Sequence, residues 1–213
     1  MACNLMPHDV EFPMTQISSK LGLPAACFAA TLSAATAAQS DTATYVLDPD
    51  HTTVAFTIMH AGYAKTLGRF ADVQGSFAYN DETQELSEVS VTIATGSVET
   101  WHAARDKHVK SDDFLAAESH PQITFVATEG APITATTGTV TGDLTIRGVT
   151  QPVTLEVTQN LLANYPCCHA RETLGISATT TILRSNFGST YALPVFVGDE
   201  VDIMLEFEAI RQD

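Results

Sequence analysis

The sequence predicts an all-β fold, an antiparallel β-barrel of about eight strands with one short helix near residues 101–110. Three observations support this prediction. From Tyr45 onward, apolar residues recur at every second position. Short turn-forming sequences separate these runs, and only one segment has helical character. Because a sheet with one apolar face must hide that face from water, the pattern favours closure into a barrel.

The alternation is clear where Val54, Phe56 and Ile58 are separated by small or polar residues. Side chains two positions apart share one face of a strand, so each such run predicts a strand with one apolar face and one wet face. The same spacing recurs within Val89–Ile93, Ile123–Ala127, Val140–Ile146, Val153–Val157 and Val201–Phe207.

Turn-forming residues lie between the predicted strands, at Asn80-Asp81, Glu129–Pro132, Arg147-Gly148 and Gly198-Asp199. Such short connections suggest an up-and-down order of strands. A closed barrel of about eight strands has room for side chains or for one small ligand, as in lipocalins. Alternation fits a filled barrel and a hollow one equally well, so the residues alone leave both open.

Residues 101–110 contain neither Gly nor Pro and follow Thr100, a suitable N-cap residue. His102 and His108 are six positions apart, about 120° around a helix, and cannot share a metal ion. Two interpretations of the charged residues remain open. Asp106 pairs with His102 and Arg105 and pins the helix over the barrel mouth, or the basic side chains accept a phosphate or quinone headgroup.

The N-terminal segment predicts export. Residues 21–38 are uncharged and rich in Ala, and Ala35–Ala37 supplies a small-x-small cleavage pattern. We therefore expect residues 1–38 to be a signal peptide, with Met14 as an alternative start, and residues 39–213 to form a single β-barrel domain. The expected location of the mature chain is the periplasm.

Composition and motifs argue against several classes of function. The formal net charge of −15 disfavours nucleic-acid and anionic-membrane partners. No Gly-x-Ser-x-Gly elbow, dinucleotide fingerprint or phosphate-binding loop is present, so we expect no enzyme and no required cofactor. The acidic pairs Asp112-Asp113 and Glu206/Glu208 fit solvated positions.

Two of the four cysteines, Cys3 and Cys27, would leave with the signal peptide. The remaining pair, Cys167-Cys168, is adjacent and cannot join distant segments. Cys167-Cys168-His169 is too short to supply a full metal site, so we expect either a vicinal disulfide or a loop without a special role.

Several motifs resemble the YceI-like family of periplasmic polyisoprenoid-binding proteins. The resemblance covers about residues 44–210. The matching segments are Ser97–Leu115 with His120–Phe125, His60–Tyr63 with Gly68–Phe70, Thr141–Leu155 and Thr180–Gly188. The loop Asn164–Arg171, which contains the two cysteines, departs from the pattern expected of the family.

The resemblance implies a lipocalin-like barrel that binds, stores or transports a long isoprenoid lipid, an isoprenoid quinone or a polyprenyl phosphate, without catalysis. Headgroup contacts are expected at His60, Tyr63, His102 and Arg105. The expected apolar lining, taken from strand alternation, is Phe56, Ile58, Phe70, Phe77, Val91, Ile93, Phe125, Leu144, Leu155, Ile182, Phe187 and Phe207.

Two other functions remain open at this point. One is an enzyme acting on a quinone or acyl lipid, with His102 and His108 as acid and base. The other is an interaction module with a solid core. The sequence also leaves open a membrane or redox partner and a homodimer.

Overall fold

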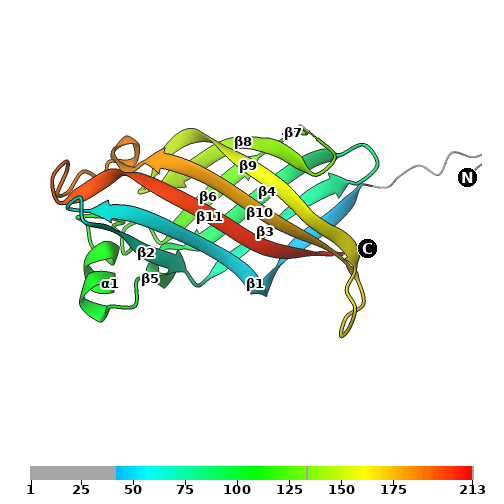
Figure 1. Cartoon of the computed structure of the whole chain (residues 1–213), viewed down its shortest axis with the longest axis horizontal. Coiled ribbons are helices and arrows are strands. Elements are labelled where there is room, and N and C mark those ends of the chain that lie inside the picture. The colour runs from blue at the N-terminus through cyan, green and yellow to red at the C-terminus, as the bar shows by residue number, and fades with distance from the viewer. Residues whose placement is uncertain (1–41, 133, 213) are drawn as a thin grey trace, which may run out of the picture. The chain divides into compact units, whose positions relative to one another are not determined.

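The computed structural model describes residues 42–132 and 134–212, so the predicted signal peptide lies outside the described residues. The described part holds one α-helix, α1 (Ala103–Lys110), two 3-10 helices, η1 (Thr95–Ser97) and η2 (Arg184–Phe187), and eleven strands (Figure 1). The strands are β1 (Ala43–His60), β2 (Ala64–Phe70), β3 (Val73–Asn80), β4 (Glu85–Ala94), β5 (Val98–Glu99), β6 (Gln122–Ala127), β7 (Gly130–Pro132), β8 (Thr137–Ile146), β9 (Val149–Asn164), β10 (Glu172–Leu183) and β11 (Val197–Arg211).

Eight of these strands form a closed antiparallel ring in the order β1-β3-β4-β6-β8-β9-β10-β11. The ring closes because β1 pairs with β11 from Tyr45 opposite Arg211 to His60 opposite Val197. The second half of β1 also pairs with β2, which carries β5, and β7 pairs with β8. The predicted barrel of about eight strands with one short helix is therefore confirmed. None of the described helices has the length and hydropathy needed to cross a membrane.

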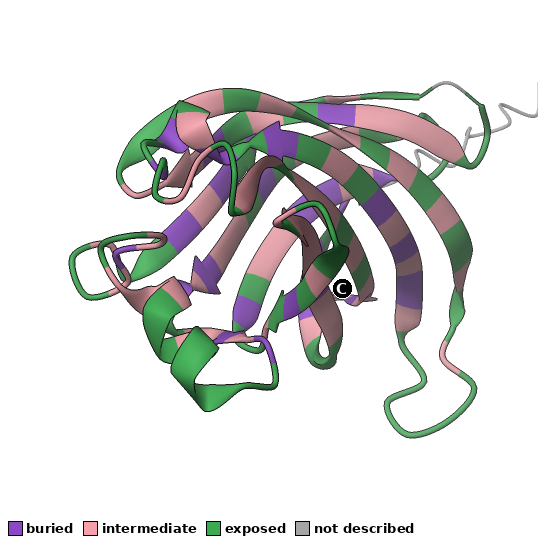
Figure 2. Cartoon of the chain, turned by 60° about the vertical axis from the view of Figure 1, so that its left-hand side comes forward, coloured by how far each residue is buried: buried purple, intermediate pink, exposed green. Residues whose placement is uncertain are grey.

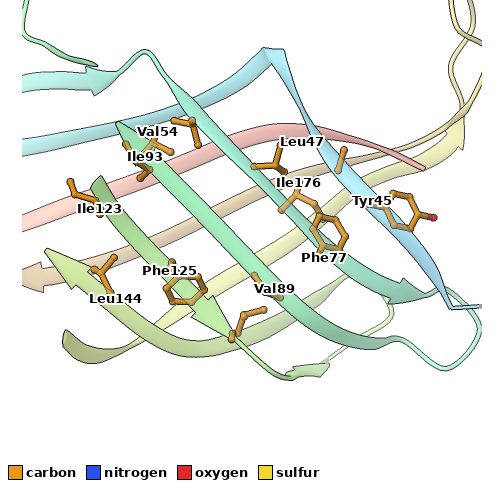
Figure 3. Packing of buried hydrophobic residues seen from close by; sticks show 14 of the residues in the cluster. Tyr45, Leu47, Val54, Phe77, Val89, Ile93, Ile123, Phe125, Leu144 and Ile176 are labelled. Atoms are coloured by element: carbon orange, nitrogen blue, oxygen red, sulfur yellow. The ribbon is translucent and has the colours of Figure 1, made fainter. Parts of the chain in front are cut away.

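The strands alternate between buried and exposed residues, as their sequence pattern predicts (Figure 2). Seven strands of the ring contribute buried residues and β9 contributes partly buried ones; Val54, Ile93, Phe125 and Ile176 belong to the resulting apolar cluster (Figure 3). Each buried aliphatic or aromatic side chain contributes about 1.5–3 kcal/mol relative to exposure. This shared interior is what holds the closed sheet together.

Local details differ from the sequence-based expectations at the ends of elements. Thr100 is not the N-cap of α1; His102 is, and its Nδ1 accepts a hydrogen bond from the Arg105 N–H at 3.3 Å. Two expected turns are wholly or largely strand: Gly198-Asp199 lies inside β11, and most of Glu129–Pro132 is β7. In both places cross-strand pairing outweighs the turn preference of Gly and Pro.

At the α1 end of the barrel, a buried arginine fixes the segment that joins η2 to β11. Arg184 is 6% exposed. Its guanidinium donates to the carbonyls of Gly198, Ser189 and Tyr191 at 2.8 Å each and to Val197 O at 3.1 Å. Burial lowers the pKa of Arg184, but these four carbonyls compensate for its desolvation.

We expect Arg184→Met to destabilise the fold by about 3 kcal/mol, because it leaves buried carbonyl groups without donors. Urea denaturation followed by tryptophan fluorescence measures this loss. Arg147→Met is the matched control, since Arg147 also donates to two carbonyls but at a more exposed site. An equal loss in both variants would contradict the role given to Arg184.

At the opposite end, Glu172 of β10 links three neighbouring strands. Its Oε1 accepts hydrogen bonds from Tyr45 Oη at 2.6 Å and from Arg211 Nη1 at 3.0 Å. The Tyr45 hydroxyl, and then Arg211, hold the pKa of Glu172 below its usual value, while burial raises the pKa of Tyr45. A carboxyl group whose pKa is lower in the folded state stabilises the fold above its unfolded pKa.

This contribution is lost as the pH falls through the lowered folded pKa of Glu172. We expect Glu172→Gln to destabilise the protein by about 1 kcal/mol at pH 6, where the carboxylate is charged. The difference should be smaller at a pH of about 3, which lies below the ordinary Glu pKa of about 4.3, because the carboxyl group of the unfolded chain is protonated there. Urea midpoints at the two pH values test this, and a pH-independent difference would contradict it.

Candidate functional site: an apolar barrel cavity

The interior of the barrel is hollow, with a cavity of about 610 Å³. This volume lies within the range of about 300–1,000 Å³ typical of small-molecule sites. The interpretation as a solid-core interaction module is therefore wrong. Apart from Tyr45, the core residues labelled in Figure 3 line the cavity wall as well as belonging to the packed cluster.

The cavity is long and follows the barrel axis. On β11, Val197 and alternate residues from Val201 to Phe207 lie on its wall, a span of ten residue steps or about 34 Å along the strand. With a strand tilt of about 40°, this corresponds to roughly 25 Å along the axis. A linear ligand fits this shape better than a compact one.

All twelve residues expected to form the apolar lining lie on the cavity wall. Eleven of them lie on strands, where the two-residue period fixes the inward positions of a closed barrel, and Phe187 lies in η2. Ala178 on β10 and Leu174 near its start also line the cavity. Whether these residues contact a ligand stays a prediction.

The four expected headgroup residues separate into two pairs. His60 and Arg105 lie on the cavity wall. Tyr63 is 92% exposed in the turn between β1 and β2 and does not line the cavity, and the exposed His102 is occupied as the N-cap of α1. The structure therefore does not bring Tyr63 and His102 into the cavity.

Helix α1 presents one face to the cavity. Arg105, His108 and Val109 line the wall, and their spacing of three and four positions places them on the same side of the helix. Arg105 Nε donates to Thr100 Oγ1 at 2.8 Å and its Nη2 donates to Thr100 O at 2.6 Å. A network does pin the helix, but it centres on Thr100 and differs from the expected pairing of Asp106 with His102 and Arg105.

Asp106 completes this network from the other side of the helix. Its Oδ1 accepts from the Thr100 N–H at 2.6 Å and from the Thr100 hydroxyl at 2.5 Å, and the hydroxyl contact lowers the pKa of Asp106. Sequence reasoning paired Asp106 with His102 and Arg105 instead. The sequence does not reveal Thr100 as the partner of Asp106, because Thr100 lies before the helix and is positioned by β5.

Three aromatic rings that line the cavity meet near Arg184, whose guanidinium carbon lies 5.6 Å from the centre of the Phe114 ring. His108 lies 5.0 Å from Phe114 and 5.3 Å from Tyr191, and the last two are 5.4 Å apart, all edge to face. His108 Nε2 also lies 2.9 Å from Asp113 Oδ2. Sequence reasoning missed Tyr191 and Arg184 as cavity residues, because both belong to irregular segments without periodicity.

The charge of the wall differs from that of the whole chain. The described residues that line the cavity include no Asp or Glu, although the chain has 25 acidic residues. They do include four basic side chains, His60, Arg105, His108 and Arg184, all near the α1 end. The opposite end of the lining is neutral, with residues such as Gln84, Thr136 and Gln159. The cavity is therefore apolar along its length and basic at one end.

The cysteines of the β9–β10 loop are distant in sequence from these wall residues. Cys167 and Cys168 are exposed free thiols with their Sγ atoms 2.8 Å apart, so the structure contains no vicinal disulfide. Neither residue lines the cavity.

Comparison with known proteins agrees with this architecture. The YceI-like domain profile matches residues 45–209. A UPF0312 protein of Pseudomonas paraeruginosa is 37% identical over 179 residues, covering 83% of this chain and 92% of its own length. The crystal structure of the Campylobacter jejuni YceI protein matches with a TM-score of 0.64 and 29% identity, over 73% of this chain and 90% of its own.

A third protein is similar in fold. The structure of a polyisoprenoid-binding domain from Saccharophagus degradans superposes with a TM-score of 0.55 over 80% of this chain and 99% of its own, at 13% identity. At this identity the likeness concerns the fold alone. The profile match over the barrel and the identity with the Pseudomonas protein show that this chain belongs to the YceI-like family.

Proposed function

We propose that this protein is a non-catalytic carrier that holds a long isoprenoid lipid lengthwise in its barrel. The observation that carries the proposal is the elongated apolar cavity of about 610 Å³. Each CH₂-sized group moved from water into such a cavity contributes about 0.8 kcal/mol before the costs of association. A prenyl chain has many such groups, so it can bind tightly without a metal or a nucleophile.

The basic end of the cavity supports an anionic or strongly polar headgroup, such as a polyprenyl phosphate or an isoprenoid quinone. Arg105 offers a guanidinium at the mouth, and no lining carboxylate among the described residues would repel a phosphate there. The tail would then run toward the neutral end near Gln159. The name of the Saccharophagus domain, a polyisoprenoid-binding protein of similar fold, is consistent with this class of ligand.

The alternative of an enzyme with His102 and His108 as acid and base has less support. His102 is exposed and caps α1, and only His108 faces the cavity. A carrier also fits the sequence of residues 21–38, which predicts export to the periplasm. In that compartment the protein would shield a lipid from water between membranes.

A substitution that fills the cavity tests directly whether the lipid binds there. Ala178→Phe places a ring in the cavity, because Ala178 is buried and lines its wall. Loss of room for two CH₂-sized groups should weaken binding about tenfold. Protein purified from the periplasm of the expressing bacterium is extracted with organic solvent, and the lipid per chain is counted by mass spectrometry.

The matched control is Thr179→Phe, which adds the same ring to the exposed face of β10. We expect the wild type and this control to release a prenyl lipid, and Ala178→Phe to release little. A wild-type protein that carries none, even after incubation with isoprenoid quinones and polyprenyl phosphates, would refute the proposal.

Substitution of Arg105 tests whether this side chain binds the lipid headgroup. The wild type should prefer a polyprenyl phosphate to the matching uncharged polyprenol, and Arg105→Gln should reduce that preference about tenfold, since charge-assisted hydrogen bonds contribute about 1.5–3 kcal/mol. Lys107→Gln is the control on the same helix, because Lys107 does not line the cavity. An unchanged preference in Arg105→Gln would place the headgroup elsewhere.

A further inference from the structure

A pronounced irregularity interrupts the seam that closes the barrel. Leu47 of β1 lies opposite Ala209 of β11, and Thr52 lies opposite Phe207. Four residues, Asp48 to His51, therefore face the single residue Glu208. Such bulges break the alternation of a strand and redirect its side chains.

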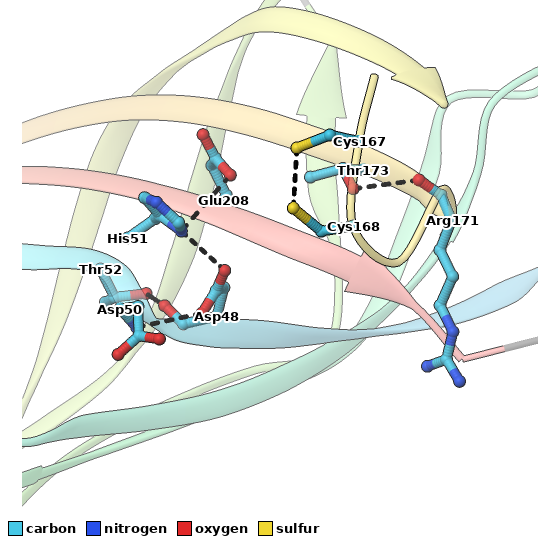
Figure 4. Close-up of polar contacts among 9 residues, drawn as sticks. All are labelled: Asp48, Asp50, His51, Thr52, Cys167, Cys168, Arg171, Thr173 and Glu208. Atoms are coloured by element: carbon cyan, nitrogen blue, oxygen red, sulfur yellow. Dashed lines mark hydrogen bonds and ion pairs between the residues drawn. The ribbon is translucent and has the colours of Figure 1, made fainter. Parts of the chain in front are cut away.

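Hydrogen bonds within the bulge hold it in one conformation (Figure 4). Asp48 Oδ1 accepts from the Asp50 N–H at 3.0 Å, and the Thr52 hydroxyl donates to Asp48 O at 2.6 Å. As a result, Asp48 and His51 point toward the outer face of β11 at Glu208. The backbone of the bulge therefore sets the arrangement of Asp48, His51 and Glu208, which is not a chance surface contact.

The three side chains bring one nitrogen and two carboxylate oxygens together. His51 Nδ1 lies 2.7 Å from Asp48 Oδ2 and 3.7 Å from Glu208 Oε2. One possible ligand atom from each of the three residues lies within 4.8 Å of the other two. Donors around a tetrahedral ion at about 2.1 Å are about 3.4 Å apart, between the two measured separations.

Glu208 provides an independent indication of a ligand. Its Oε2 atom is buried and accepts no hydrogen bond from the described residues, although the whole side chain is 33% exposed and this oxygen lies 3.7 Å from His51 Nδ1. A buried carboxylate oxygen without a partner is costly, and a bound cation removes that cost. The sequence suggested a solvated acid at this position; the bulge is what buries the oxygen.

We infer that Asp48, His51 and Glu208 form a site for a divalent transition-metal ion of the zinc class on the outer wall of the barrel. Imidazole nitrogen with carboxylate oxygens suits Zn²⁺, whereas Mg²⁺ and Ca²⁺ prefer oxygen alone. The two carboxylates balance the charge of the ion. The His51 side chain is 50% exposed, which leaves room for water as a fourth ligand.

The β9–β10 loop at the same end of the barrel is a competing binder that any test must separate. Its exposed thiols, Cys167 and Cys168, are themselves ligands for soft metals. His169 of the same loop lies near enough to Asp48 to contribute to the lowering of its pKa. The inference concerns the bulge alone, so binding must persist when the thiols are removed.

The test is isothermal titration calorimetry of the purified full chain, stripped with EDTA and titrated with zinc chloride. His51→Gln and Glu208→Gln should each weaken binding by at least about tenfold. Cys167→Ser/Cys168→Ser and His169→Gln should bind zinc as the wild type does. Because zinc stabilises the state it binds, it should raise the Tm of the wild type and the cysteine variant but not that of His51→Gln.

Three outcomes would overturn the inference: a wild-type chain that binds no zinc, binding that disappears with the cysteines, or binding unchanged in both His51→Gln and Glu208→Gln. The first would mean that His51 sits between the two carboxylates as a protonated imidazole. Melting curves without zinc establish that each variant is folded. If His51→Gln is unfolded, Glu208→Gln decides the question.

Discussion

The pairing of β1 with β11 is the constraint on which the rest of the structure depends. An open sheet with this sequence would expose an apolar face and two edges. Closure hides the face and pairs the edges, and the Glu172 and Arg184 clusters stabilise the two ends of the closed ring. Closure creates the interior, which in a ring of eight strands can be filled by side chains or can hold one small ligand; in this protein it encloses a cavity.

Closure also keeps acidic side chains on the outside of the barrel, away from the cavity. The chain carries a formal charge of −15, yet the described cavity lining has no acidic residue. In a strand, acidic residues at outward positions such as Glu206 keep the surface soluble while their neighbours stay apolar. The net charge thus describes the outside of the barrel and says little about what its interior accepts.

Much of this organisation could be predicted from the sequence. The two-residue period identified most strands and the eleven expected wall residues that lie on them, since in a strand that period decides which side chains face inward; Phe187 lies in η2. The period carries no information about empty space, so the choice between a filled and a hollow barrel needed the structure.

Irregular segments were not predictable in the same way. Tyr63 lies in a turn and faces solvent, and Thr100 binds Asp106 instead of capping the helix. Arg184 lines the cavity from a 3-10 helix, and His51 meets Glu208 only because four residues bulge against one. Each of these positions depends on contacts between segments far apart in the chain, which a local pattern cannot register.

The central claim is that the hollow of the barrel is occupied by an extended apolar chain. A crystal structure of the protein isolated from its native compartment, without delipidation, tests it most directly. We expect continuous elongated density along the barrel axis, with its widest part beside Arg105 at the α1 end. An interior closed by rearranged side chains, or filled with ordered water, would contradict the account.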